Sequence, residues 1–304
     1  MYCGDQGISR GVLVSILSLL KNNSESLHIY IMTIKYPGVE QFKQKTAEFL
    51  DHLVKGKISG LDQKFTKNGK ETNFVKLIDA TKVFKKNVPE KNMGTYFTPC
   101  AMLRLYMDQV PELKQCTRML YLDYDVVCRG DIARFYHTDL TGIEAAGVLD
   151  IYGRRWYHYR GLLKWRRDAG VVDLRPAGER YEWILKQDYM NSGVMLFNLE
   201  ECRRTGMFKR AIEICMTRKM LLPDQAALNK ATQHRKLMPR KYNEQDERPR
   251  QDTVLHHFSN NFKFWPYFRV QKVKPFEVQK IHDILKITEY DDILKEYKSL
   301  ESNL

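Results

Sequence analysis

Apolar and polar residues alternate along this chain with two different periods, which predict helices and strands in turn. Apolar residues recur at helical spacing over Val12–Leu20, whereas β-branched and aromatic residues gather over Leu27–Ile34 and again over Phe74–Ile78. The first pattern predicts a buried helix, and the other two predict strands. A weaker amphipathic pattern over Val39–Leu53 predicts a second helix between these strands. This alternation is typical of a Rossmann-like α/β fold with a mixed, mostly parallel sheet.

The rest of the chain continues the same alternation. Short apolar segments over Met119–Leu122 and Ala145–Leu149 predict buried strands. Tyr189–Leu199 begins with polar residues that predict a turn and continues as a strand, and the amphipathic pattern over Glu201–Lys219 predicts one helix. A short helix is predicted from Pro223 and a last strand from Val254. Charged packing helices are predicted beyond Lys274.

Two aspartates interrupt one of the most apolar parts of the sequence. Asp123 and Asp125 follow the predicted strand over Met119–Leu122 and precede a second apolar run. Because residues i and i+2 of extended backbone point to the same side, the two carboxylates can converge on one hard cation such as Mg²⁺ or Mn²⁺. The alternative is a solvated strand end with two exposed acids. Asp5 and Asp150 also follow predicted strands, and open α/β sheets bind ligands at the carboxyl ends of their strands.

Composition and charge narrow the class of protein. The chain has 304 residues, of which 43% are hydrophobic and 29% charged, as in ordinary globular proteins. The sequence contains no signal-peptide pattern and no apolar run as long as a membrane span, and its six cysteines are scattered. We therefore expect reduced, mostly buried thiols and a cytoplasmic protein. The net charge of +13 indicates an anionic partner, which can be nucleic acid, a phosphate-bearing substrate or an anionic membrane.

A basic, aromatic segment stands apart from the predicted elements. Residues 151 to 180 carry eight Arg and Lys residues against three acids, interleaved with four Trp and Tyr residues between Trp156 and Trp165. Arginine with aromatic residues suits sugar rings, phosphates or lipid headgroups. The simpler alternative is a solvated, irregular excursion. If the segment contacts lipid, the protein is expected to lie peripherally on the inner face of an anionic membrane.

Six short segments carry a resemblance to a known family. They occur in that family's order and are Tyr2–Asp5, Arg104–Leu105, Leu120–Asp125, Asn191–Asn198, Asp224–Gln225 with Leu228–Asn229, and His257–Lys263 with Trp265. Together they resemble glycosyltransferase family 8, which includes bacterial lipopolysaccharide galactosyl- and glucosyltransferases and glycogenin. The resemblance covers residues 2 to 265. It implies the type A fold of the nucleotide-diphospho-sugar transferases, with a catalytic domain over residues 1–270, an acceptor-side excursion at about 151–188 and a helical extension over 271–304.

The resemblance also implies an activity. Members of this family transfer a hexose from a UDP-sugar, with retention at the anomeric carbon, and they use a divalent metal, usually Mn²⁺ and otherwise Mg²⁺. The implied partners are UDP-galactose or UDP-glucose and a saccharide or glycolipid acceptor in the synthesis of cell-surface polysaccharide or lipopolysaccharide. No nucleic acid is implied.

The resemblance assigns roles to residues of this sequence. The metal ligands are Asp123, Asp125 and His257. The residues that line the sugar and take part in catalysis are Asp150, Asp224 and Gln225. The nucleotide-sugar-binding residues are Cys3, Gly4, Asp5, Gln6, Arg104, Asp123, Tyr124, Asn191, Ser192, Asn260 and Lys263.

The sequence departs from the family's pattern at three places, and two other protein classes compete with the resemblance. The segment Gln6-Gly7-Ile8 stands where the family often has Asn and Tyr, Asn260 stands where glycine is common, and Phe264 stands where proline is frequent. A basic nucleic-acid-binding protein would explain the net charge, but its phosphates would be repelled by aspartates at the strand ends. A Mg²⁺-dependent nucleotidyltransferase would also use paired acids, but it would lack the Asn-Ser-Gly and Asp-Gln segments.

Overall fold

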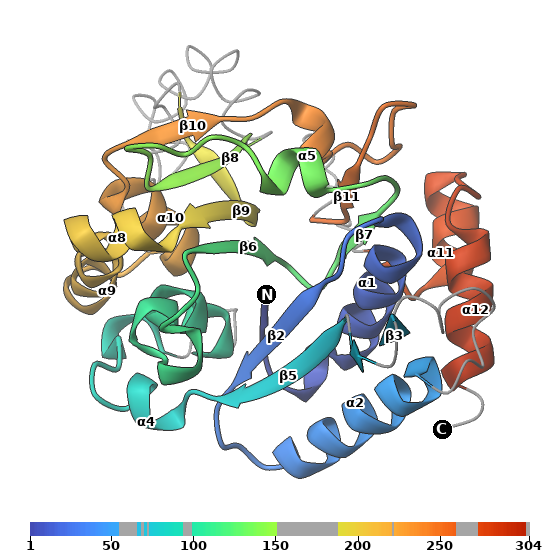
Figure 1. Ribbon diagram of the computed structural model, residues 1–304, viewed down its shortest axis with the longest axis horizontal. Helices are drawn as coiled ribbons and strands as arrows, with labels where there is room; N and C mark the ends of the chain where they lie inside the picture. Colours follow the sequence, from blue (N-terminus) through green and yellow to red (C-terminus); the bar gives the residue numbers. More distant parts are fainter. Residues whose placement is uncertain are drawn as a thin grey trace, which may run out of the picture. The chain divides into compact units, whose positions relative to one another are not determined.

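The chain folds into two units, each built from segments that are far apart in the sequence. The computed structural model describes residues 1–54, 66–67, 70–71, 73–93, 99–150, 188–220, 222–259 and 273–301. The first unit comprises Met1–Asp79, Leu122–Thr138 and Lys241–Leu304, and the second comprises Ala80–Tyr121 and Asp139–Arg240. The ribbon in Figure 1 shows mixed α/β structure, as the sequence predicts.

A parallel sheet forms the centre of the first unit. Its strands are β1 (Tyr2–Cys3), β2 (His28–Thr33) and β5 (Phe74–Asp79), in the order β1-β2-β5, with Tyr2 opposite Ile31 and His28 opposite Phe74. The connecting helices are α1 (Ser9–Asn22) and α2 (Val39–Val54), as predicted (Figure 1). A small antiparallel pair, β3 (Thr66–Lys67) and β4 (Lys70–Glu71), lies between α2 and β5 in the sequence.

Helix α1 is the buried centre of this unit. Every residue from Gly11 to Leu20 is buried, including two serines. Their hydroxyls are satisfied because Ser15 Oγ lies 2.8 Å from Tyr2 Oη and Ser18 Oγ accepts a hydrogen bond from Cys128 N at 2.9 Å. The second bond ties α1 to strand β7 (Val126–Cys128), which follows the aspartate pair. Burial of the apolar face and pairing of the polar groups therefore fix the helix beside that segment.

A second, antiparallel ladder joins two distant parts of the first unit. Strand β11 (Leu255–His257) pairs with β7 so that Leu255 lies opposite Cys128 and His257 opposite Val126. The predicted strand over Val254–Phe258 is thus present, and its register brings His257 beside the residue that follows Asp125. The short helix α5 (Ala133–Tyr136) and the turn η5 (Arg240–Tyr242) flank this ladder in the sequence.

The C-terminal helices pack on the first unit. They are α11 (Val278–Lys280), the π-type turn η6 (Ile281–Leu285) and α12 (Asp291–Glu301). Helix α12 lies beside α1 and α2 (Figure 1) and buries Ile293, Leu294, Tyr297 and Leu300. Lys21 pairs with Glu296 at 2.6 Å, and Arg10 pairs with Glu301 at 2.8 Å. The predicted packing helices are confirmed.

The second unit holds a mixed sheet in the order β10-β8-β9-β6, whose last strand runs into the first unit at Leu122. Strand β8 is parallel to β10 and antiparallel to β9. The strands are β6 (Arg118–Leu122), β8 (Ala145–Leu149), β9 (Met190–Asn198) and β10 (Arg235–Leu237). The helices and turns are α4 (Thr81–Phe84), η2 (Glu90–Asn92), η3 (Pro99–Gln109), η4 (Pro111–Leu113), α8 (Leu199–Thr205), α9 (Met207–Thr217) and α10 (Pro223–Ala231).

Two local predictions for the second unit are wrong. The segment over Glu201–Lys219 forms two helices instead of one, because Gly206 adopts a left-handed conformation with φ 71° that ends α8 and starts α9. Glycine takes this conformation without the Cβ penalty that other residues incur. The polar residues Asn191 and Ser192 lie within β9 instead of a preceding turn.

Two further findings bear on the sequence-based expectations. All six cysteines lie in the described part of the chain, and five of them are buried, as expected. Within the described residues, no helix is both long and apolar enough to cross a membrane.

Candidate functional site

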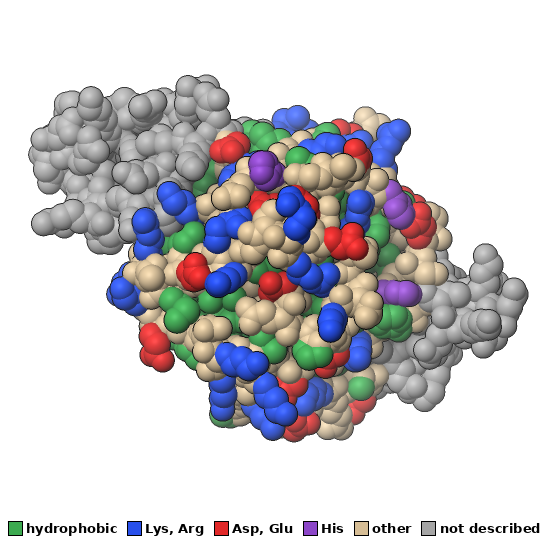
Figure 2. All heavy atoms as spheres, turned by 60° about the vertical axis from the view of Figure 1, so that its left-hand side comes forward, with side chains coloured by type: hydrophobic (Ala, Val, Ile, Leu, Met, Phe, Trp, Pro, Cys, Tyr) green, Lys and Arg blue, Asp and Glu red, His purple; other side chains and the backbone are tan. Residues whose placement is uncertain are grey.

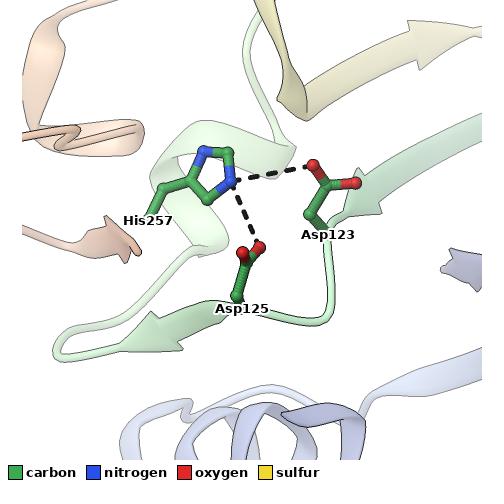
Figure 3. A group of neighbouring side chains, drawn as sticks. All are labelled: Asp123, Asp125 and His257. Atoms are coloured by element: carbon green, nitrogen blue, oxygen red, sulfur yellow. Dashed lines mark ion pairs between the residues drawn. The ribbon is translucent and has the colours of Figure 1, made fainter. Parts of the chain in front are cut away.

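Asp123, Asp125 and His257 meet in the first unit (Figure 3). The aspartates lie on the short connection between β6 and β7, and His257 is the last residue of β11. His257 Nε2 lies 3.2 Å from Asp125 Oδ1 and 3.6 Å from Asp123 Oδ2. One ligand atom from each residue lies within 4.8 Å of the others, which is close enough for all three to hold one metal ion.

The backbone of β11 and its neighbours fixes the imidazole in this cluster. Phe258 N donates to Asp125 O at 2.9 Å, and His257 N donates to Glu244 O at 2.8 Å. On the side chain, His257 Nδ1 lies 3.1 Å from Asn243 Oδ1. An amide oxygen only accepts, so Nδ1 carries a proton, and Nε2 is the ring nitrogen that faces the two carboxylates. Metal-ligating histidines are commonly held in this way by a hydrogen bond to the other ring nitrogen.

Asp125 is buried and lies against a lysine from the C-terminal segment. Lys274 Nζ forms an ion pair with Asp125 Oδ2 and lies 4.9 Å from the centre of the Tyr124 ring. Burial by itself would raise the pKa of Asp125, but the charges of Lys274 and His257 outweigh it and hold this pKa below its ordinary value. Burial lowers the pKa of Lys274, and the Asp125 carboxylate more than reverses that effect, so this pKa is raised. Both groups are therefore charged at neutral pH.

The chemistry of this donor set fits a divalent metal. Two carboxylates suit Mg²⁺ and Mn²⁺, and a neutral imidazole favours a transition metal such as Mn²⁺ over Mg²⁺. In Figure 3, His257 Nε2 and the two carboxylates point toward one another. The residues of this chain thus fit the metal that the resemblance implies.

The nucleotide-binding candidates near the N-terminus belong to the same unit. Leu122 N donates to Met1 O at 2.9 Å, which joins the start of β1 to the strand that precedes Asp123. Cys3 and Gly4 are buried, whereas Gln6 is exposed. Asp5 caps the turn η1 (Gln6–Ile8) by accepting a hydrogen bond from Gly7 N at 2.9 Å. The roles of these residues in nucleotide binding remain predictions.

Four candidates of the second unit form one buried hydrogen-bonded cluster. Asp150 Oδ2 accepts from Asn191 Nδ2 at 3.0 Å and from Gln225 Nε2 at 3.2 Å. Gln225 Oε1 accepts from Ser192 N at 2.9 Å and lies 3.2 Å from Ser192 Oγ. The backbone N–H can only donate, so this bond fixes which end of the Gln225 amide faces Ser192 and which faces Asp150.

Arg104 and Asp224 extend this cluster. Arg104 Nε lies 3.1 Å from Asp224 Oδ2, and its Nη1 donates to Ser192 O at 3.0 Å. The guanidinium also lies 4.0 Å from the centre of the Tyr121 ring. Arg104 is only 4% exposed, so its guanidinium is not solvated at the surface but lies against an anion. That anion is the Asp224 carboxylate.

The sequence did not predict the contact of Lys274 with Asp125, and some predicted site residues lie outside the described part of the chain. Lys274 is 149 residues from Asp125 in the chain and opens the segment predicted to contain only packing helices, so no local pattern pointed to it. Asn260, Lys263 and most of the predicted excursion over 151–188 lie outside the described residues.

The surface shows where part of the basic charge lies. On the face drawn in Figure 2, Lys and Arg side chains are numerous but are interspersed with Asp and Glu. That face of the described residues therefore carries no continuous basic stripe of the kind that tracks a nucleic-acid backbone.

Comparison with known proteins agrees with the fold. A curated relative, lipopolysaccharide 1,2-glucosyltransferase of Escherichia coli (strain K12), is 27% identical over 246 residues, which are 80% of this chain and 60% of that protein. The chain thus spans about 60% of the length of the curated relatives it matches.

Two solved structures of LgtC share the fold of this chain. An active-site mutant of LgtC is 14% identical with a TM-score of 0.61, covering 98% of this chain and 94% of that one. Galactosyltransferase LgtC in complex with donor and acceptor sugar analogs is 13% identical with a TM-score of 0.57 and the same coverage. The predicted type A glycosyltransferase fold is confirmed.

The family model described as glycosyl transferase family 8 matches residues 1–268. The chain therefore belongs to glycosyl transferase family 8.

Proposed function

We propose that this glycosyltransferase moves a hexose from a UDP-sugar to a saccharide acceptor of the lipopolysaccharide type, with retention and with the help of a divalent metal. The observation that carries the proposal is the cluster of Asp123, Asp125 and His257, in which a hydrogen bond at Nδ1 holds the imidazole with Nε2 toward the carboxylates. Membership of family 8 supplies the reaction class. The curated relatives, of which this chain spans about 60%, support the type of acceptor.

The first unit is assigned the metal and the diphosphate. When bound, Mn²⁺ or Mg²⁺ would neutralise the charge that develops on the departing diphosphate. Asp123, Asp125 and His257 would hold the ion with two carboxylate oxygens and one imidazole nitrogen. Asp5 and Tyr124 are assigned to the nucleotide, and Lys263 is assigned a second positive charge beside the diphosphate.

The second unit is assigned the donor sugar. A sugar losing its leaving group gains cationic character and needs an electron-rich neighbour on its far face. Gln225 Oε1 and the carboxylates of Asp150 and Asp224 are such groups, and hydrogen bonds from Ser192 and Asn191 orient the first two. The cluster is compatible with two routes: one through a protein nucleophile, and a front-face route in which the leaving phosphate takes the proton of the acceptor.

The names of the relatives favour one donor. The curated relatives are glucosyltransferases, which supports UDP-glucose as the donor to test first. UDP-galactose is the alternative, since LgtC is a galactosyltransferase. The two sugars differ in one hydroxyl configuration, and a few pocket contacts decide between them.

The basic charge supports peripheral contact with an anionic membrane that carries the acceptor. The net charge of +13 and the Arg- and Trp-rich residues 151 to 180 motivate this part of the proposal. Deleting that segment should release the protein from anionic liposomes at a lower salt concentration than the intact chain requires. Equal salt dependence with and without the segment would contradict this.

A screen of metal-dependent hydrolysis across UDP-sugars tests the proposed function, because slow hydrolysis needs no acceptor. We expect UDP release from UDP-glucose with Mn²⁺ and none with chelator. Asp123→Asn and Asp125→Asn should abolish this hydrolysis without unfolding the protein, since each removes one ionised ligand. Asp252→Asn, which neutralises an exposed acid of the same unit, is the matched control. Wild-type rates for either ligand variant in saturating Mn²⁺ would end the metal-site assignment.

A further inference from the structure

Lys274 contacts the candidate metal cluster, although neither the sequence nor the family pattern assigns it a role there. Its ammonium group is paired with Asp125, and its side chain is 20% exposed. A lysine that buries most of its side chain loses solvation, which an ion pair of good geometry compensates. The location of Lys274 therefore requires an explanation beyond surface charge.

The two oxygens of Asp125 face different partners. Oδ2 receives the Lys274 ammonium, whereas Oδ1 lies 3.2 Å from His257 Nε2 on the side of the cluster. A carboxylate can satisfy one partner with each oxygen at the same time. Because Lys274 occupies Oδ2, the carboxylate is turned so that Oδ1 faces His257 Nε2, another candidate ligand.

The backbone around Lys274 is itself held in place. Lys274 N donates to Glu277 Oε2 at 2.8 Å, and Glu277 N donates to Lys274 O at 2.9 Å. This reciprocal pair closes a turn just before α11, and Pro275 within it restricts the backbone further. The Lys274 side chain thus extends from a turn that hydrogen bonds hold in place.

We propose that Lys274 is a positioning residue for the metal site, which holds Asp125 through one oxygen and so presents the other oxygen to the metal. This inference rests on the proposed function, because it assigns a partner to a metal ligand of that site. Residues that hold a metal ligand from behind typically contribute ten- to a hundredfold to metal affinity. The opposite possibility is that Lys274 competes with the metal for Asp125 and leaves when the metal binds.

Mn²⁺ titration of the purified full-length chain, followed by electron paramagnetic resonance of the free ion, distinguishes these possibilities without any measurement of turnover. Lys274→Met keeps most of the length of the side chain but removes its charge, and we expect Mn²⁺ binding to weaken by about tenfold. Lys274→Arg retains the charge and should recover most of the affinity. Lys295→Met removes the same charge from an exposed position of α12 and should change nothing. A purely structural role for Lys274 would lower the melting temperature without changing the affinity of the folded protein.

A second measurement uses only the wild-type chain, so it does not depend on the folding of a variant. The rate at which an amine-reactive reagent modifies Lys274 is followed by mass spectrometry with and without Mn²⁺. The proposal predicts that Mn²⁺ does not accelerate the modification, because Lys274 stays on Asp125. Acceleration by Mn²⁺, or Lys274→Met binding Mn²⁺ as tightly as the wild type or more tightly, would overturn the proposal.

The two levels of inference fail in different ways. If the wild-type chain binds no Mn²⁺ and Asp125→Asn changes nothing, the proposed metal site itself is wrong. If Mn²⁺ binds, Asp125→Asn abolishes binding and Lys274→Met has no effect, only the role of Lys274 is wrong.

Discussion

Gly11 of α1 is a position where one added methyl group should displace Tyr124 and thereby disturb Asp123 and Asp125. A Cβ at this position would lie 2.4 Å from Tyr124 Cδ2 and 2.6 Å from Tyr124 O. Tyr124 stands between Asp123 and Asp125, so the carbonyl cannot move away without carrying the neighbouring aspartates with it. We therefore predict that Gly11→Ala both destabilises the first unit and weakens metal binding.

The magnitude follows from two opposing effects. Alanine in a helix is more favourable than glycine by about 1 kcal/mol, which alone would stabilise the variant. Overpacking a close-packed site costs about 1–3 kcal/mol, and contact with a backbone oxygen lies at the upper end because backbone cannot change rotamer. The expected net loss is about 2 kcal/mol in the free energy of unfolding.

Urea unfolding and Mn²⁺ titration of the same protein measure the two effects. Gly130→Ala is the matched control, because a Cβ there would meet nothing closer than Val254 at 3.8 Å and its φ is not positive. Gly130→Ala should behave as the wild type in both measurements. If Gly11→Ala is instead as stable as the wild type or gains the full helix propensity, the close approach of α1 to Tyr124 is not as described.

Two further substitutions test the second unit. Glu144 is fully buried, where Arg210 Nη2 donates to it at 2.9 Å and Gln233 N at 2.6 Å; Glu144→Gln should cost about 2 kcal/mol at pH 7 by urea unfolding. Burial opposes ionisation of Glu144, but its hydrogen bonds hold its pKa below the ordinary 4.5. The contribution of the ionised carboxylate to stability is therefore complete above pH 4.5 and is lost as the pH falls through the folded pKa. The stability difference between wild type and variant should shrink in that acidic range, and a constant difference would contradict this. Gln225→Ala should lower the turnover number with nearly unchanged UDP affinity, because the described contacts of its side chain are with Ser192, Asp150 and Tyr189 of the second unit. Equal loss of both would make Gln225 a binding residue.

Local sequence patterns were sufficient for most elements and for the aspartate pair. The helical spacing over Val12–Leu20 and the β-rich composition over Leu27–Ile34 each describe a segment that buries its own apolar residues, and α1 and β2 form there. Asp123 and Asp125 converge as predicted, but the residues between β6 and β7 form a turn instead of the extended backbone on which that prediction was based. Gly206 was missed because a glycine inside an amphipathic pattern is compatible with one helix or two.

Contacts between distant segments could not be predicted from local patterns. The register of β11 on β7 places His257 beside Val126, and no short-range rule fixes that pairing. The resemblance to family 8 supplied His257, because its motif records such contacts. Lys274 has no such motif, so only the folded chain shows it against Asp125. The same reasoning applies to Tyr290, whose hydroxyl lies 2.6 Å from His256 Nδ1 and ties the C-terminal segment to β11.

A crystal of the chain grown with Mn²⁺ and UDP, measured at the manganese absorption edge, tests the central claim most directly. The account predicts an anomalous peak ligated by Asp123, Asp125 and His257, with Lys274 still paired to Asp125. Bound UDP with no manganese among these three side chains, or a manganese peak at another place, would contradict it.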